Sequence, residues 1–367
     1  MKRFFAAGAA LASTAVITAF AVPAIADTYY YAAGTRQADQ PSQTSPNEWR
    51  AFLGQSHLPE AYTVQYPRDL APLIGSATLD DSVDAGVADA LALIARHDDG
   101  QRVVLVGVSQ GAVVAARAKQ ALIADPDDGI DPTEITVVTF GDPVNPDGGL
   151  LAKLDRLNID IPGFTPTTDV PGQGDYVTYV IEYDLVADTP DTLNPLSWAN
   201  AVIGGVYDHA TYSHDLIAEA AADGRVVTNT EEWYTVSDGQ PGAQADAYYQ
   251  HNLIKQKNLP LTRPLRDIAT SIADDRGDLV VNRAVDGLDN LLRPVVDAGY
   301  DGGRAGGSRH VGATTTHFRD GDGNPVGTDK PNRPLRDAVD HIGGQVKKAV
   351  ADTVDRIKSR AATVRND

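Results

Sequence analysis

The residues best suited to chemistry are grouped around Ser109, in the sequence Gly107-Val108-Ser109-Gln110-Gly111. This motif follows a β-branched run at 102–106 and precedes a run of small residues at 111–124, which predicts a strand, a sharp turn and a helix. Such a turn presents the serine Oγ above the carboxyl edge of a sheet, near the positive end of the helix. The flanking glycines leave room for the turn, and the backbone N–H of Gln110 becomes one donor to an oxyanion. The pattern therefore predicts a nucleophilic serine for acyl transfer.

A serine hydroxyl is a weak nucleophile unless a histidine removes its proton and an acid orients that histidine. On a sheet that carries this turn, the acid and then the histidine are expected after the serine, on loops at later strand ends. The strand predicted at 176–183 leads into Asp184, which stands where the acid should, and Asp188 is the alternative. Either carboxylate could instead cap a turn.

The expected order excludes His57 and His97, because both precede Ser109. His209 and His214 lie before or at the start of a helix predicted to end near residue 222, and the residues alone leave the choice between them open. The remaining histidines lie in less regular sequence and are predicted to be surface residues: His251, His310, His317 and His341.

Strands and helices alternate along most of the chain. Continuous β-branched runs are typical of strands that are buried on both faces of a parallel sheet. The predicted fold class is therefore α/β, a three-layer sandwich with a mainly parallel central sheet and a C-terminal helical extension. Strands are predicted at 28–32, 62–66, 102–106, 133–140 and 176–183, a hairpin at 226–236, and helices at 79–97, 111–124 and 264–296.

The amino terminus has the pattern of an export signal. Lys2 and Arg3 precede an uncharged apolar run at 4–22, and Ala24-Ile25-Ala26 matches the A-x-A cleavage pattern. We therefore expect a cleaved signal peptide at 1–26 and a protein that is secreted or held at the cell envelope; a retained membrane anchor is the alternative. A folded domain is predicted at 27–302, a Gly-rich linker at 303–333 and an amphipathic helical tail at 334–367.

Composition narrows the classes of partner. The chain of 367 residues carries 31 Lys and Arg against 50 Asp and Glu, a formal net charge of −19, which argues against a nucleic-acid partner. Residues 303–367 are the exception, with 12 Lys and Arg against 8 Asp, so the tail is either a solvated helix or makes a peripheral contact with an anionic envelope surface.

No cofactor and no metal site is expected. The chain has no cysteine, which excludes a disulfide scaffold, a thiol nucleophile and a Cys-ligated metal. Neither a phosphate-binding loop nor a dinucleotide fingerprint follows a strand, and no H-E-x-x-H is present. Residues 320–324 only briefly match a calcium loop, because Pro325 and Pro331 stand where glycine and an acid are required.

Several of these motifs together resemble the PE-PPE domain of mycobacteria and related actinobacteria, a serine α/β-hydrolase group similar to cutinases. The resemblance spans Tyr29 to Asp301. It rests on the motif around Ser109 and on the segments 140–145, 183–188, 209–212, 258–266 and 299–301. Cutinases normally carry disulfides, so the absence of cysteine favours the PE-PPE branch and weakens the transfer of cutin as a substrate.

The resemblance implies roles for individual residues. Asp184 and His209 match the acid and base blocks of cutinases, which selects them over Asp188 and His214. Thr35, after Gly34, matches the hydroxyl residue that helps to form the cutinase oxyanion hole.

The implied activity is that of a secreted serine esterase or lipase that hydrolyses acyl esters, short-to-medium or longer, through an acyl-enzyme. The alternatives are an acyltransferase that moves acyl groups onto a cell-envelope glycolipid, and a catalytically silent envelope-binding module. The apolar insert at 193–203 is expected either to pack as core or to form a wall or lid for an acyl chain.

Overall fold

The computed structural model describes residues 27–37, 40, 61–97, 100–124, 130–159, 161–167, 174–237, 240–242, 245–272, 275–300, 312 and 314–319. Several predictions fall outside these residues: the signal peptide at 1–26, the helix at 334–367, most of the linker at 303–333 and the turn at 320–324. The same holds for His57, His310 and His341.

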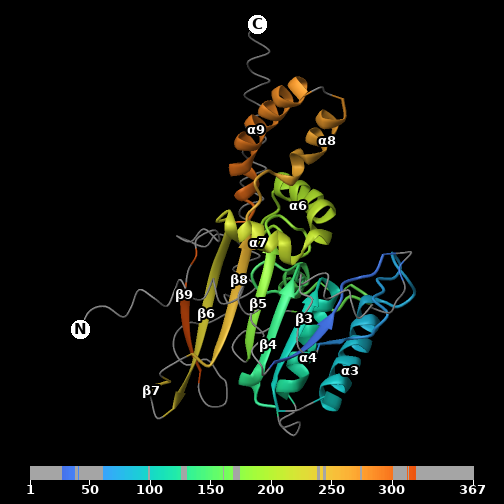
Figure 1. Ribbon diagram of the computed structural model, residues 1–367, viewed down its shortest axis with the longest axis vertical. Helices are drawn as coiled ribbons and strands as arrows, with labels where there is room; N and C mark the ends of the chain where they lie inside the picture. The colour runs from blue at the N-terminus through green and yellow to red at the C-terminus, as the bar shows by residue number, and fades with distance from the viewer. Residues whose placement is uncertain are drawn as a thin grey trace, which may run out of the picture.

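One mixed sheet of nine strands, in the part of the chain described, forms the centre of the fold (Figure 1). Its order is β2-β1-β3-β4-β5-β8-β6-β7, with β9 beside β6; β1 to β5 and β8 run parallel, and β6 is antiparallel to β8. The strands are β1 (Asp27–Ala32), β2 (Ala61–Thr63), β3 (Arg102–Val108), β4 (Ile135–Phe140), β5 (Asp175–Ile181), β6 (Val226–Ser237), β7 (Gln240–Pro241), β8 (Ala247–Ile254) and β9 (Thr314–Arg319).

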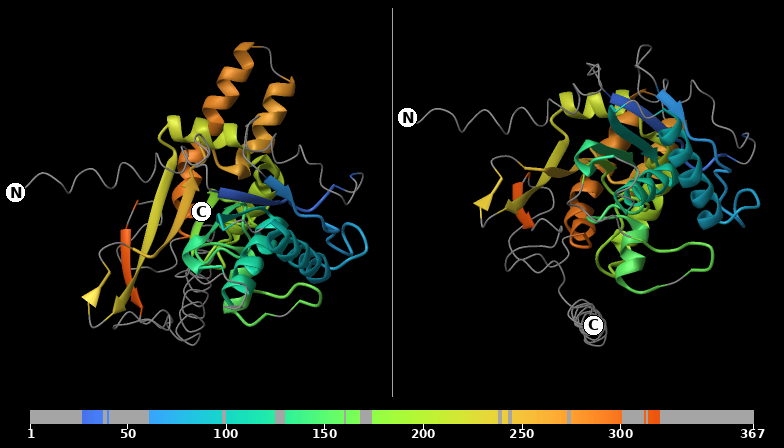
Figure 2. Two further views of the ribbon diagram at one scale, coloured as in Figure 1. Left: turned by 60° about the horizontal axis from the view of Figure 1, so that its bottom comes forward. Right: turned by 90° about the horizontal axis from the view of Figure 1, so that it is seen from below.

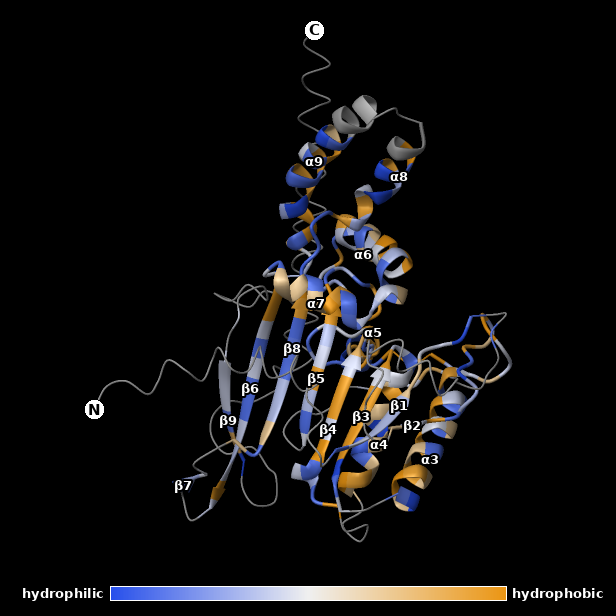
Figure 3. Ribbon diagram, viewed as in Figure 1, coloured by the Kyte–Doolittle hydropathy of each residue, from blue (hydrophilic) through white to orange (hydrophobic). Residues whose placement is uncertain are grey.

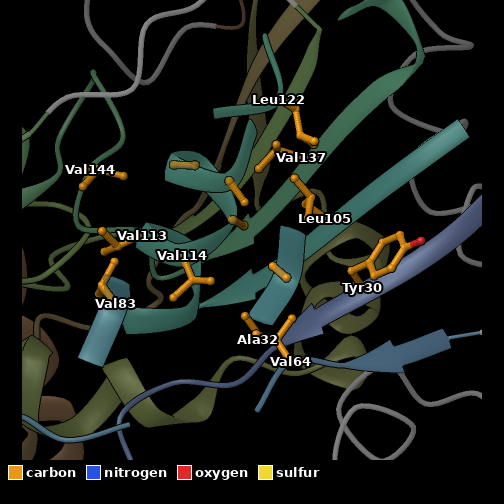
Figure 4. Packing of buried hydrophobic residues seen from close by; sticks show 14 of the residues in the cluster. Tyr30, Ala32, Val64, Val83, Leu105, Val113, Val114, Leu122, Val137 and Val144 are labelled. Carbon is orange, nitrogen blue, oxygen red and sulfur yellow. The ribbon is translucent and has the colours of Figure 1, made fainter. Parts of the chain in front are cut away.

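Helices cover both faces of this sheet, which confirms the predicted three-layer α/β class. They are α3 (Leu79–His97), α4 (Gln110–Ala124), α5 (Leu150–Arg156), α6 (Pro195–Asp208), α7 (His214–Ala222), α8 (Arg263–Ile272) and α9 (Asp275–Asp297). Side chains of α3, α4 and α5 pack on one face in the larger core cluster, which includes Leu105, Val113 and Val137 (Figure 4). Ile217 and Ala220 of α7 pack on the opposite face, where Phe140 lies.

Hydropathy changes across the sheet. The central strands β3 and β4 are mostly apolar, whereas β6 and β8 carry long polar stretches (Figure 3). A strand with helices on both faces needs apolar residues at every position, and an outer strand does not. Ser109 is therefore presented by the most apolar part of the sheet, where helices cover both faces.

The structure differs from three predictions in the second half of the chain. Residues 226–237 form one long strand rather than a hairpin, because they contain no Gly or Pro to turn the chain before 238. Residues 314–319, inside the predicted linker, form β9. His251 is only 4% exposed, because β8 is inserted between β5 and β6. His317, also predicted to be a surface residue, lies on β9, where its ring stacks on the Trp233 ring with 4.5 Å between the ring centroids.

Three helices lie beyond the carboxyl ends of the parallel strands. Asn194 caps α6 by accepting hydrogen bonds from Leu196 N–H and Ser197 N–H, and Pro195 occupies its first turn. The helical stretch predicted at 264–296 forms the pair α8 and α9, which projects away from the sheet (Figure 2). Among the described residues, none of the helices has the length and apolar character that crossing a bilayer requires.

Candidate active site

The strand–turn–helix predicted around Ser109 is present. Ser109 lies between β3 and α4 with a φ of 52°, the left-handed region that a sharp turn at this position requires. Its N–H donates to Phe140 O at 2.9 Å, which ties the turn to β4. A Cβ on Gly107 would lie 2.3 Å from Gly111 O, and one on Gly111 would lie 2.0 Å from Ala32 O. Both glycines are therefore required by close backbone approach.

The loop after β5 carries the predicted acid. The chain turns at Tyr183, whose φ is 69°, and Asp184 follows with a fully buried side chain. Asp184 Oδ1 accepts a hydrogen bond from Val186 N–H at 3.0 Å, so one carboxylate oxygen holds the loop. The other oxygen, Oδ2, faces His209.

The predicted base follows α6 directly. His209 Nδ1 lies 2.8 Å from Asp184 Oδ2, and His209 Nε2 lies 2.7 Å from Ser109 Oγ. The side chain of His209 is 20% exposed. Ser109, His209 and Asp184 therefore form one continuous hydrogen-bonded chain, in the geometry in which an imidazole can take a proton from a serine while a buried carboxylate orients it.

The residues considered as alternatives lie elsewhere. Asp188 Oδ2 accepts from Tyr183 N–H at 2.7 Å, so this buried carboxylate closes the turn that precedes Asp184. His214 opens α7, with Nδ1 3.4 Å from Asp215 Oδ1. Neither residue belongs to the hydrogen-bonded chain around Ser109.

Tyr212 is a fourth member of the site. It belongs to the 209–212 motif, but the sequence predicted no role for it. Its hydroxyl donates to Asp184 Oδ2 at 2.9 Å and accepts from Ile181 N–H at 2.9 Å. Burial and the neighbouring Asp184 carboxylate raise the pKa of Tyr212 well above its ordinary value, so the phenol stays protonated and remains a donor. Gly141 makes room for the ring, because a Cβ there would lie 2.7 Å from Tyr212 Cε2.

Tyr212→Phe is expected to lower kcat for ester hydrolysis about tenfold, because the variant removes a hydrogen bond to a buried carboxylate. Initial rates with a p-nitrophenyl ester measure this effect. Tyr207→Phe is the matched control, since it removes a phenol hydroxyl that donates to Asp267 on the exposed side of α6. Equal kcat values for Tyr212→Phe and Tyr207→Phe would contradict a role for Tyr212 in holding Asp184.

Of the two residues predicted for the oxyanion hole, Gln110 follows Ser109 directly, and Thr35 follows Gly34. Gln110 is the first residue of α4, so its N–H lies at the positive end of that helix. Gly34 approaches the turn so closely that a Cβ on it would lie 3.3 Å from Ser109 Cβ. The oxyanion role of Thr35 remains a prediction. Across the described residues, no three His, Asp or Glu side chains cluster in a way that could hold a metal ion.

Comparison with known proteins bears on this geometry. The sequence profile of the PE-PPE domain matches residues 59–301. The chain belongs to the PE-PPE domain family. Among curated PE-PPE relatives, it is 30% identical over 310 residues to the protein named Esterase PE16 of Mycobacterium tuberculosis (strain ATCC 25618 / H37Rv). That match covers 81% of this chain and 53% of the relative.

A further PE-PPE relative is the uncharacterized PPE family protein PPE28 of the same strain, 31% identical over 243 residues, which are 64% of this chain and 33% of the relative. The chain thus spans between a third and about half of the length of these two relatives. A solved structure titled as a novel cutinase-like protein from Cryptococcus sp. aligns with 18% identity and a TM-score of 0.27. The alignment covers 45% of this chain and 80% of the cutinase-like protein's chain.

Proposed function

We propose that this PE-PPE protein is a serine esterase that hydrolyses acyl esters through an acyl-enzyme. The observation that carries the proposal is the unbroken chain from Ser109 Oγ through His209 to the buried Asp184, with distances of 2.7 and 2.8 Å. The esterase name of a relative at 30% identity supports the same reaction class.

The mechanism follows from the positions of these atoms. Ser109 Oγ attacks the ester carbonyl while His209 Nε2 takes its proton, and Asp184 holds the imidazole in the tautomer with Nδ1 protonated. The backbone N–H groups of Gln110 and Thr35 and the Thr35 hydroxyl stabilise the oxyanion. His209 then protonates the leaving alcohol, and a water that it activates releases the acyl group from Ser109.

Acyl chains are the proposed substrate class, and α6 supports this choice. Its inner face packs in the fold through Ser197, Asn200 and Ala201, which are fully buried. Its outer face is apolar but exposed, with Val202 at 48% and Val206 at 77%. Exposed apolar side chains on the helix that leads into His209 form a suitable wall for an acyl chain.

A chain-length series tests both proposals. Hydrolysis of p-nitrophenyl acetate, butyrate and octanoate should rise from acetate to the longer esters, and a fluorophosphonate should label Ser109. Equal rates across the series would count against the acyl-chain wall. Absence of both hydrolysis and label would favour a silent envelope-binding module. Acyl transfer to added trehalose in preference to water would favour the acyltransferase alternative.

Export is a separate proposal. Cleavage after Ala26 would leave Asp27, the first residue of β1, as the new amino terminus, so the sheet would keep the whole strand. The intact mass of the exported protein tests this, since retention of residues 1–26 would contradict it. A peripheral contact of the basic tail with an anionic envelope surface is proposed only from the charge of residues 303–367.

A further inference from the structure

Two adjacent residues contact both of the segments assigned to the oxyanion hole. Arg68 and Asp69 lie 33 or more positions from Thr35 and 41 or more from Gln110. Arg68 is nevertheless hydrogen-bonded to the residues on both sides of Thr35, and Asp69 is hydrogen-bonded to the side chain of Gln110. We propose that Arg68 and Asp69 are positioning residues that hold the oxyanion hole in its working geometry. This inference rests on the proposed esterase function.

The contacts on the Thr35 side come from Arg68. Its Nε donates to Gly34 O at 2.7 Å, and its backbone carbonyl accepts from Arg36 N–H at 3.1 Å. The residues immediately before and after Thr35 are therefore both bonded to Arg68. Arg68 is only 4% exposed and has a φ of 58°, so a buried guanidinium and an unusual backbone conformation are maintained at this position.

The contacts on the Gln110 side come from the backbone of Asp69. Gln110 Nε2 donates to Asp69 O at 2.7 Å, and Asp69 N–H donates to Ser82 Oγ at 3.1 Å. The Ser82 hydroxyl in turn reaches Gln110 Oε1 at 3.3 Å. All three residues are buried. The side chain of Gln110 is thus held at both ends, which fixes the first turn of α4 from which its N–H projects.

The Asp69 carboxylate links these two sets of contacts. Its Oδ1 accepts from Arg36 Nε at 2.8 Å, and its Oδ2 accepts from Ser76 N–H and Ala77 N–H at 2.8 and 3.1 Å. Burial acts to raise the pKa of Asp69, but these hydrogen bonds and the Arg36 charge outweigh it and hold that pKa below its usual range. A Cβ on Gly75 would lie 2.0 Å from Asp69 Cγ, so the turn closes tightly around the carboxylate.

An oxyanion hole is sensitive to such support. Its donors act on charge that develops in the transition state, and their effect depends on a fixed orientation. Loss of the Arg68–Asp69 contacts should therefore lower kcat while leaving KM nearly unchanged. The pH profile should keep its shape, because Ser109, His209 and Asp184 remain in place.

The experiment compares Arg68→Met and Arg36→Met with Arg117→Met, using p-nitrophenyl butyrate over a pH series. Arg117 is the matched control, because it pairs with Asp80 and Asp84 on the outside of α3 and touches neither oxyanion segment. Arg68→Met is expected to lower kcat about 10- to 100-fold with KM within about threefold. Arg36→Met removes the hydrogen bonds to Asp69 Oδ1 and to Gln40 O, and it is expected to lower kcat several-fold. Arg117→Met is expected to lower kcat less than twofold.

Circular dichroism and thermal unfolding establish which variants fold. If Arg68→Met does not fold, Arg36→Met decides, since its side chain is 17% exposed and its backbone hydrogen bond is kept. Folded variants with wild-type kcat, or with a changed KM alone, would overturn the positioning role. The esterase function would still stand if the wild-type protein hydrolysed the ester and took the fluorophosphonate label. A wild-type protein that neither hydrolyses the ester nor takes the label would overturn both.

Discussion

His209→Ala is expected to lower kcat for p-nitrophenyl ester hydrolysis by about four to six orders of magnitude. The imidazole is the group that lies within hydrogen-bonding distance of both Ser109 Oγ, at 2.7 Å, and Asp184 Oδ2, at 2.8 Å. Without it the serine hydroxyl has no base, and only binding and the oxyanion hole still assist the reaction. Steady-state rates measure the loss.

His214→Ala is the matched control for the base. His214 lies five residues further on, opens α7 and has its Nδ1 3.4 Å from Asp215. We expect its removal to change kcat less than about twofold, because solvent-exposed contacts of this kind contribute little. A larger loss from His214→Ala than from His209→Ala would show that the base is wrongly assigned. Fluorophosphonate labelling of either variant would not change that conclusion.

Asp184→Asn is expected to lower kcat about 10³- to 10⁴-fold while leaving the fold intact. An amide has nearly the same shape as the carboxylate, and its oxygen can still accept from Val186 N–H while its NH2 group faces His209 Nδ1. It cannot stabilise the imidazolium that forms when His209 takes the proton, nor select the required tautomer. The effect should therefore appear in kcat and not in the temperature of unfolding.

Asp188→Asn should have the opposite result. Asp188 Oδ2 accepts from Tyr183 N–H within a buried turn. The neutral amide keeps this hydrogen bond but removes the charge that strengthens it, so the unfolding temperature should fall, whereas kcat of the folded fraction should change only a few-fold. Thermal unfolding and active-site titration separate the two quantities. If Asp188→Asn lost more activity per folded molecule than Asp184→Asn, the acid would have to be reassigned.

The sharp turn around Ser109 and the central sheet could be predicted because their signals are local. The motif between 107 and 111 needs small residues where backbones approach within a few ångströms, and this requirement is visible in the sequence as glycine. The helix predicted at 79–97 has those bounds in the structure, because its apolar spacing and acidic start are also local features. The strands β8 and β9 were not predicted, because polar residues interrupt both sequences and remove the continuous apolar pattern that marks β3 and β4.

The sequence by itself determined the fold class, and it predicted a nucleophilic serine at Ser109 with an acid and then a base after it. The residues alone did not decide whether Asp184 or Asp188 is the acid, or whether His209 or His214 is the base, and the family resemblance selected Asp184 and His209. Only the tertiary structure decided that the loops after β5 and α6 bring Asp184 and His209 together beside Ser109. It also revealed the Tyr212 hydroxyl and the Arg68–Asp69 contacts. These contacts join segments that are remote in sequence, so their formation depends on how the strands and helices pack and leaves no periodic signal along the chain.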